Sequence, residues 1–288
     1  MSRSEERGAD DPFATERMPR IILAAPPVVV PPAPGSDAAE IPDDRRPERG
    51  RAVVRGAGEL LLTAGFVILL FVVYELFVTD LATAQDQARL DHQLHAAWRA
   101  DSPVRLDAEP EPAVGKPIAI VHIPRLGSDY QRVIVEGTDQ QQLAQGPGHY
   151  VGTAMPGQQG NFALAGHRVG KGSPFLDLDT LRPGDAIVVE TAGQWLVYRV
   201  LGDPRNGSFT TDPSGIPGQE VVPPTALDAV SPTPDRASDA PATEAYLTIT
   251  TCNPKYSART RLVVHARLDG GPVSKASAPQ GPPALRGQ

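Results

Sequence analysis

The chain has very little cysteine and no excess of basic charge, and each shortage excludes a class of protein. Cys252 is the only cysteine among 288 residues, which excludes an internal disulfide. One thiol with scattered histidines also offers no cluster of metal ligands. The formal net charge of -7 argues against nucleic acid as the main partner, because binding to phosphates needs a basic face. No metal, cofactor or nucleic acid is therefore expected, and the lone thiol is a candidate reactive group.

Proline and glycine are abundant, at 31 and 27 residues, and they indicate long linkers and loops. Residues 1–57 are rich in charge, proline and alanine, as in AAPPVVVPPAPGSD. Such a segment cannot bury enough apolar surface to offset its ordering entropy, so we expect a disordered cytoplasmic tail. Residues 269–288, rich in glycine, proline and serine, are expected to form a second disordered tail.

One apolar run predicts a transmembrane helix over residues 58–79. Its core, LLLTAGFVILLFVVYELFV, is long enough to cross a hydrocarbon layer of roughly 30 Å. Arginines precede the run and aspartates follow it, so the positive-inside rule places the N-terminus in the cytoplasm. A cleaved signal peptide is the alternative, but the run starts far from the N-terminus and lacks a clear cleavage site. We expect a single-pass protein of the cell membrane with an extracytoplasmic C-terminal part.

Residues 80–115 are expected to form an extracytoplasmic stalk and linker. The stretch TDLATAQDQARLDHQLHAAWRA is rich in helix formers, whereas DSPVRLDAEPEPAVGKP is typical of an extended linker. His92 and His95 have a spacing that suits a metal ion. No third ligand is near in sequence, which favours solvated positions on a helix.

Residues 116–268 carry the signals of one folded domain. Short apolar or alternating segments end at glycines or turns, among them IAIVHIP, QRVIVEG, GNFALAGHR, AIVVET, WLVYRVLG, AYLTITT and TRLVVHARL. About seven or eight such strands with little helix predict a mostly β fold, either a largely antiparallel barrel or a sandwich. Residues 203–243, rich in proline, serine, threonine and aspartate, are expected to be a long connection within the domain.

Cys252 lies at the end of a predicted strand, which places its thiol at the rim of the sheet. The segments AYLTITTC and RLVVHARL are close enough in sequence to pair as antiparallel neighbours. Period-two counting then puts Cys252 on the face of Thr250, and Arg261 on the face of His265. An arginine beside the thiol is able to donate to a substrate carbonyl or a developing oxyanion. The alternative is a small buried hydrophobe, with both Arg259 and Arg261 in solvent.

Histidine is the expected general base for a thiol nucleophile. Four histidines lie in the domain: His122, His149, His167 and His265. His167 follows a strand and a glycine in ALAGHRVG, which places it at a sheet edge, whereas His265 shares the predicted face of Arg261. Spacing alone leaves both as candidates.

The segment LTITTC, with Arg261 downstream and NFALAGHR upstream, resembles the sortase family of Gram-positive cysteine transpeptidases. Residues 248–252 are similar to the TLxTC motif of that family, with isoleucine in place of the usual leucine. The segments GPGHYVGTAMPGQQGNFALAGHR and GSPFLDL are similar in particular to class E, housekeeping-type sortases. The resemblance covers residues 116–268 and extends to the N-terminal anchor.

This resemblance implies an eight-stranded β-barrel with short helices and assigns roles to three residues. It makes Cys252 the nucleophile, His167 the general acid and base, and Arg261 the group that stabilises the oxyanion or positions the substrate. Arg259 is the weaker choice, because the family's arginine directly precedes the apolar run of the last strand, as in RLVV. His149 matches a class E stretch that carries no assigned role.

The implied reaction consists of two acyl transfers. The Cys252 thiolate cleaves the Thr–Gly bond of an LAxTG- or LPxTG-type sorting signal on a surface protein and forms a thioester. An amine of a lipid-linked peptidoglycan precursor then resolves the thioester, with hydrolysis as a side activity. The alternatives are a membrane-anchored cysteine peptidase, a pilus-polymerising sortase, and a non-enzymatic β-barrel binding module with an incidental thiol.

Overall fold

The computed structural model of the chain describes residues 48–74, 79–100, 112–210, 212–237, 241–242 and 244–286. Most of the tail predicted for residues 1–57 and most of the linker before residue 112 lie outside the described residues.

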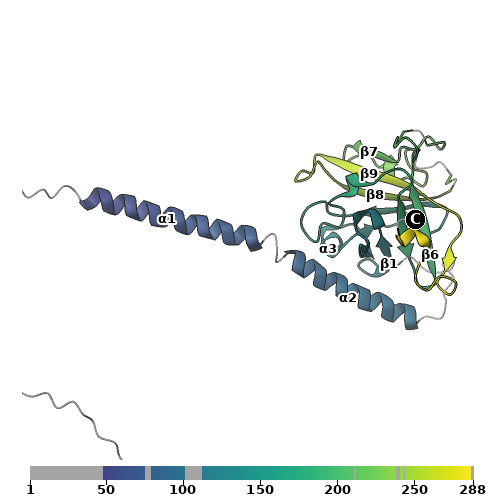
Figure 1. Cartoon of the computed structure of the whole chain (residues 1–288), viewed down its shortest axis with the longest axis horizontal. Helices are drawn as coiled ribbons and strands as arrows, with labels where there is room; N and C mark the ends of the chain where they lie inside the picture. The colour runs from purple at the N-terminus through teal and green to yellow at the C-terminus, as the bar shows by residue number, and fades with distance from the viewer. Residues whose placement is uncertain are drawn as a thin grey trace, which may run out of the picture. The chain divides into compact units, whose positions relative to one another are not determined.

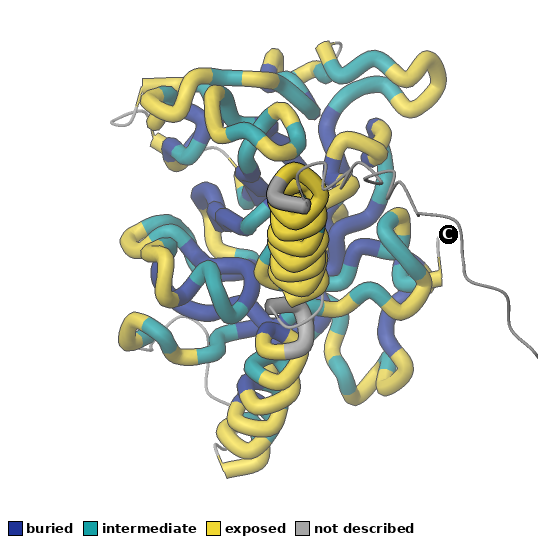
Figure 2. Tube along the Cα trace, turned by 90° about the vertical axis from the view of Figure 1, so that its left-hand side faces the viewer, coloured by how far each residue is buried: buried dark blue, intermediate teal, exposed yellow. Residues whose placement is uncertain are grey.

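A long helix, α1 (Glu48–Val73), covers most of the predicted membrane span (Figure 1). By length and composition, Gly50–Val73 is able to cross a membrane. The helix is exposed along its length (Figure 2), and its large apolar residues are among the exposed ones. The helix starts before residue 58, where the predicted span begins. Its added first turns contain arginines and a glutamate. Such charged residues suit the water-facing end of a membrane helix.

Ten strands form one sheet, and eight of them close into a barrel. The order around the ring is β6-β5-β1-β2-β3-β4-β8-β9, and pairing of β6 with β9 closes it. Outside the ring, β10 adds to β6 and β7 adds to β9. The pairs β2–β3 and β4–β8 are parallel, and the others are antiparallel. The predicted mostly β, eight-stranded barrel is confirmed.

The strands are β1 (Pro117–His122), β2 (Gln131–Glu136), β3 (Gly148–His149), β4 (Gly160–Ala165), β5 (Ala186–Glu190), β6 (Gln194–Val200), β7 (Gln219–Val222), β8 (Ala245–Asn253), β9 (Thr260–Leu268) and β10 (Val273–Ser274). The helices after α1 are α2 (Thr79–Ala100) and α3 (Gln140–Leu143), with short 3₁₀ helices η2 (Pro124–Leu126), η3 (Leu178–Thr180), η4 (Asp228–Val230) and η5 (Pro283–Arg286).

The barrel core is built from alternate side chains of β8 and β9 together with the other strands. Leu247 and Ile249 of β8 are fully buried in it. Because successive side chains of a strand point to opposite faces, Thr250 and Cys252 lie on the outer face of β8. The two strands pair antiparallel, with Cys252 directly opposite Arg261. The pairing predicted from the sequence is therefore confirmed.

The long connection predicted for residues 203–243 contains a strand that the sequence pattern does not announce. β7 has only four residues, QEVV, set among prolines and glycines. It pairs along β9, from Gln219 opposite Val264 to Val222 opposite Arg261. The open edge of β9, rather than the local sequence, determines that these residues form a strand.

Helix α2 packs on the barrel, whereas the sequence suggested a stalk. Leu90 and Leu94 are buried, and they pack together with Ile120, Val133 and Val135 of β1 and β2. The few apolar residues of α2 therefore form a docking face and not a set of isolated positions.

The side chain of Gln87 links α2 to the middle of β2 and to the segment after α3. Its Nε2 donates hydrogen bonds to the carbonyls of Val133, at 3.1 Å, and Gln145, at 2.7 Å. Its Oε1 accepts from the backbone N–H of Val133 at 2.7 Å. The amide thus satisfies backbone groups as a neighbouring strand would, so its loss leaves those groups without partners.

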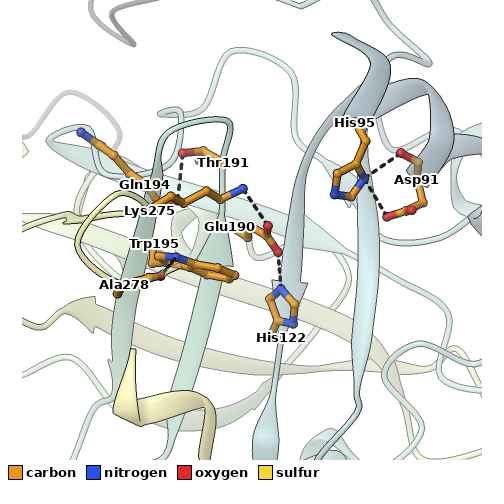
Figure 3. Close-up of polar contacts among 9 residues, drawn as sticks. All are labelled: Asp91, His95, His122, Glu190, Thr191, Gln194, Trp195, Lys275 and Ala278. Atoms are coloured by element: carbon orange, nitrogen blue, oxygen red, sulfur yellow. Dashed lines mark hydrogen bonds and ion pairs between the residues drawn. The ribbon is translucent and has the colours of Figure 1, made fainter. Parts of the chain in front are cut away.

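The C-terminal segment folds against the barrel as far as residue 286, unlike the disordered tail expected over residues 269–288, and residues 287–288 lie outside the described residues. β10 pairs with β6, and Trp195 Nε1 donates to the Ala278 carbonyl at 3.0 Å (Figure 3). Lys275 Nζ lies 2.7 Å from Glu190 Oε1 and 4.1 Å from the ring centre of Trp98. Two tryptophans and a carboxylate therefore give this polar segment a surface to cover.

Replacing Gln87 with alanine is expected to lower the free energy of unfolding by about 1–3 kcal/mol, because it removes three hydrogen bonds to backbone groups. Chemical denaturation of the full chain in detergent, followed by tryptophan fluorescence, measures this loss. Gln93→Ala is the matched control, because Gln93 is exposed on the same helix. Equal changes in the two variants would show that the hydrogen bonds of Gln87 add no stability.

Candidate active site

Cys252 lies near the end of β8 and is partly exposed. The two residues before Cys252 form hydrogen bonds with the backbone at the end of β4. Thr250 Oγ1 donates to the Leu164 carbonyl at 3.3 Å, and Thr251 Oγ1 donates to the Gly166 carbonyl at 2.8 Å. The Gly166 N–H in turn donates to the Thr250 carbonyl at 3.1 Å. These bonds hold the thiol-bearing end of β8 against the segment that leaves β4.

His167 follows β4 by two residues, and tight packing at Gly166 determines its place. A Cβ on Gly166 would lie 2.5 Å from Cδ2 of the Phe175 ring, so a larger residue would force the two segments apart. The His167 carbonyl accepts a hydrogen bond from the Phe175 N–H at 3.2 Å. Because β4 and β8 run parallel, His167 and Cys252 emerge at the same end of the sheet.

The imidazole of His167 is half-buried, and its Nε2 has no hydrogen-bond partner among the described residues. Burial lowers the pKa of His167 below its ordinary value, and the positive charge of Lys171 lowers it further. Both effects favour the neutral imidazole, which is the form that accepts a proton.

The two arginines of the last hairpin occupy different positions. Arg261 is on β9 directly opposite Cys252, and its Nη1 donates to the carbonyls of Ala258, at 3.0 Å, and Thr260, at 3.1 Å. Arg259 is exposed in the loop that precedes β9. The structure therefore places Arg261, and not Arg259, across from the thiol.

The other three domain histidines share one feature, a ring nitrogen within 3 Å of a polar side chain. His122 Nε2 is 2.9 Å from Glu190, His149 Nδ1 is 2.8 Å from Glu136, and His265 Nδ1 is 2.8 Å from the Thr248 hydroxyl. His265 shares the face of Arg261 as predicted, but it is fully buried. These pairings suit structural roles, and they distinguish these histidines from His167.

Sequence reasoning missed the environment of Arg168, the residue after His167. Its guanidinium is only 4% exposed and contacts Asp179 and Asn253. It also missed that the Tyr150 hydroxyl lies 3.0 Å from the Thr250 hydroxyl. The contacts join residues far apart in the chain, so no local motif announces them.

One group of possible metal ligands exists among the described residues. Side-chain atoms of Glu220, Asp235 and His265 lie within 4.8 Å of one another on the outer side of β9. His265 Nε2 is 3.5 Å from Glu220, so the group already contains an ion pair when the imidazole is protonated. The sequence offered His92 and His95 on α2 as a second possible pair of ligands. Nδ1 of His95 lies 3.0 Å from the Asp91 carbonyl of the same helix (Figure 3).

Comparison with known proteins identifies the family. The model of the sortase domain matches residues 121–269. Sortase SrtE1 and Sortase SrtE2 of Streptomyces coelicolor are 33% and 31% identical, each over 78% of this chain. These matches span 59% of SrtE1 and 85% of SrtE2. The structure of SrtF sortase from Corynebacterium diphtheriae is 37% identical, with a TM-score of 0.56, over 64% of this chain and 98% of that one. The chain therefore belongs to the sortase family of cysteine transpeptidases, and its similarity to the SrtE proteins agrees with class E.

Proposed function

We propose that this chain is a membrane-anchored sortase that transfers surface proteins to a peptidoglycan precursor. One observation carries the proposal. Cys252 lies opposite Arg261 across β8 and β9, while His167 leaves the neighbouring end of β4. A thiol, a group that transfers protons and a cationic hydrogen-bond donor are the components that acyl transfer requires. In this proposal the three residues are catalytic.

In the first half-reaction, Cys252 Sγ attacks the threonine carbonyl carbon of a Thr–Gly bond in an LAxTG- or LPxTG-type signal. The proton of the thiol passes to His167, and the oxyanion of the tetrahedral intermediate accepts hydrogen bonds from Arg261. The intermediate collapses with cleavage of the C–N bond, and His167 gives its proton to the leaving amine. The product is a thioester of Cys252.

In the second half-reaction, the amine of a lipid-linked peptidoglycan precursor attacks the thioester carbonyl. His167 accepts a proton from this amine, the new C–N bond forms, and the C–S bond breaks to release the thiolate, which takes the proton back from His167. The lowered pKa of His167 suits this step, because the imidazole must be neutral to accept the proton. Attack by water at the same point would give hydrolysis.

An apolar helix long enough to span a membrane supports this choice of substrates. The apolar helix Gly50–Val73 serves as the anchor, with the arginine-rich N-terminal side in the cytoplasm. The catalytic domain is then extracytoplasmic, where membrane-linked surface proteins and a lipid-linked amine acceptor are both accessible. The enzyme and both substrates are then held at the same membrane surface.

The full chain is incubated with two substrates, a peptide that contains Leu-Ala-Ala-Thr-Gly and the amine diaminopimelate. Mass spectrometry is expected to show cleavage after the threonine and a new amide bond between that threonine and diaminopimelate. Cys252→Ala and His167→Ala should each abolish the product, because one removes the nucleophile and the other removes the proton carrier. A product consisting of free acid alone, at high amine concentration, would identify a peptidase. Unchanged processing by both variants would refute catalysis by these residues.

Arg261→Ala is expected to lower kcat/KM by about 10²–10³-fold, as loss of an oxyanion donor does. Arg259→Ala is the matched control, since it removes the same charge from the same hairpin but from an exposed loop position. Steady-state kinetics with a quenched fluorescent peptide compares the two. A larger loss in Arg259→Ala would reverse the assignment.

Lys171→Gln is expected to raise the pKa of His167. Lys171 repels only the protonated imidazole, so removal of its charge stabilises the imidazolium and moves protonation to higher pH. Titration of the histidine Cε1–H signals by NMR, with His167→Gln to assign the resonance, measures the shift. Lys116→Gln, which neutralises another exposed lysine, serves as the control and should leave that signal unchanged. A fall in the pKa would contradict the proposed repulsion.

A further inference from the structure

Arg168 connects the segment after β4 to the end of β8 from a buried position. Its Nη1 donates to Asn253 Oδ1 at 2.7 Å and lies 3.5 Å from the Cys252 carbonyl. Its Nη2 lies 3.0 Å from Asp179 Oδ1, and its Nε lies 3.4 Å from the Leu176 carbonyl. All three nitrogens of the guanidinium are therefore engaged, and only the ion pair involves an acidic group.

The placement of these contacts follows the candidate catalytic residues. The residues before His167 and Cys252 are joined by the Thr251 hydroxyl, which binds the Gly166 carbonyl. The residues after them are joined by the bond from Arg168 to Asn253. His167 and Cys252 thus lie between two cross-links, one on each side.

The same network continues to β9. Asn253 Nδ2 donates to Thr260 Oγ1 at 3.1 Å, and the Thr260 hydroxyl donates to the Asn253 carbonyl at 2.9 Å. Thr260 directly precedes Arg261. Arg168, Asn253 and Thr260 are therefore connected in one chain, and each is the immediate sequence neighbour of a proposed catalytic residue.

A guanidinium is costly to bury, and stability alone explains it poorly. Its ion-pair partner Asp179 is 45% exposed in its side chain, so water weakens the attraction between the two charges. The planar guanidinium of arginine, however, holds several acceptors in fixed directions, which the flexible ammonium of lysine does not. The contacts therefore suit a residue that fixes geometry.

We propose that Arg168 is a positioning residue for the transpeptidase reaction, which acts through Asn253 to hold His167, Cys252 and Arg261 in register. The proposal rests on the proposed function of these three residues. Arg168 touches neither substrate nor reacting atoms in this role. It determines how closely the end of β8 approaches the histidine, and proton transfer is sensitive to that distance.

The test measures kcat and KM for the full chain in detergent with the Leu-Ala-Ala-Thr-Gly peptide. Arg168→Met is expected to lower kcat by about 10²-fold with KM changed by less than about threefold, because misplaced catalytic groups slow chemistry more than binding. Arg168→Lys should recover part of kcat, since an ammonium is still able to donate to Asn253. Arg125→Met is the matched control, because Arg125 pairs with Asp185 outside this network.

Two further variants separate positioning from stability. Asp179→Asn weakens the ion pair but keeps the bond from Arg168 to Asn253, so it is expected to lower Tm without lowering kcat. In a double-mutant cycle, Arg168→Met and Asn253→Ala should be non-additive in kcat, with the double variant no slower than the worse single variant. Wild-type kcat in Arg168→Met, additive effects, or an equal loss of kcat in Asp179→Asn would each overturn the proposal.

A second readout keeps this proposal apart from the choice of substrate. The rate of Cys252 alkylation by iodoacetamide at neutral pH requires no sorting signal. If the wild-type chain fails to cleave the peptide, the proposed substrate is wrong, but the positioning role is still tested. Arg168→Met should then slow alkylation toward the rate of His167→Ala, whereas Arg125→Met should not. A wild-type alkylation rate in Arg168→Met would refute the positioning role on its own.

Discussion

The parallel pairing of β4 with β8 is the constraint on which the candidate site depends, because it brings two segments far apart in the chain to one end of the sheet. Thr251 and Gly166, which are 85 residues apart, are joined by a hydrogen bond just before the thiol and the imidazole. Between β4 and β8 the chain forms β5, β6 and β7, which pair elsewhere in the sheet. The site therefore forms only when the barrel closes, and neither segment holds its geometry alone.

The outer layer of the domain packs on this closed barrel through polar contacts as well as apolar ones. Gln87 of α2 satisfies the backbone of β2, and Lys275 of the C-terminal segment bridges Glu190 and Trp98. Such contacts are directional, so they specify where α2 and the C-terminal segment lie as well as adding stability. Both segments were expected to be loosely attached, because a few apolar residues among many polar ones resemble a linker when no partner surface is known.

Electrostatics around the site favours a neutral imidazole next to positively charged groups. Burial and Lys171 lower the pKa of His167, while Arg168 and Arg261 lie beside or opposite the thiol-bearing strand. This arrangement suits a reaction in which negative charge develops on a carbonyl oxygen and a proton moves between sulfur and nitrogen. The ion pair with Asp179 compensates the charge of Arg168, whereas Arg261, across from the thiol, donates to the nearby backbone carbonyls of Ala258 and Thr260.

The sequence by itself determined a mostly β domain, the apolar helix, the β8–β9 hairpin and the position of the thiol opposite an arginine, whereas the choice of a barrel over a sandwich came from the family resemblance. These features follow from alternation and from short-range pairing, which local residues encode directly. Only the tertiary structure decided which histidine has an unengaged ring nitrogen beside that hairpin, that QEVV forms β7, and that α2 and the C-terminal segment dock on the barrel. Each of these depends on a partner surface built by distant residues. The network from Arg168 through Asn253 to Thr260 has the same origin, because a buried guanidinium is explained only by the acceptors that the fold gathers around it.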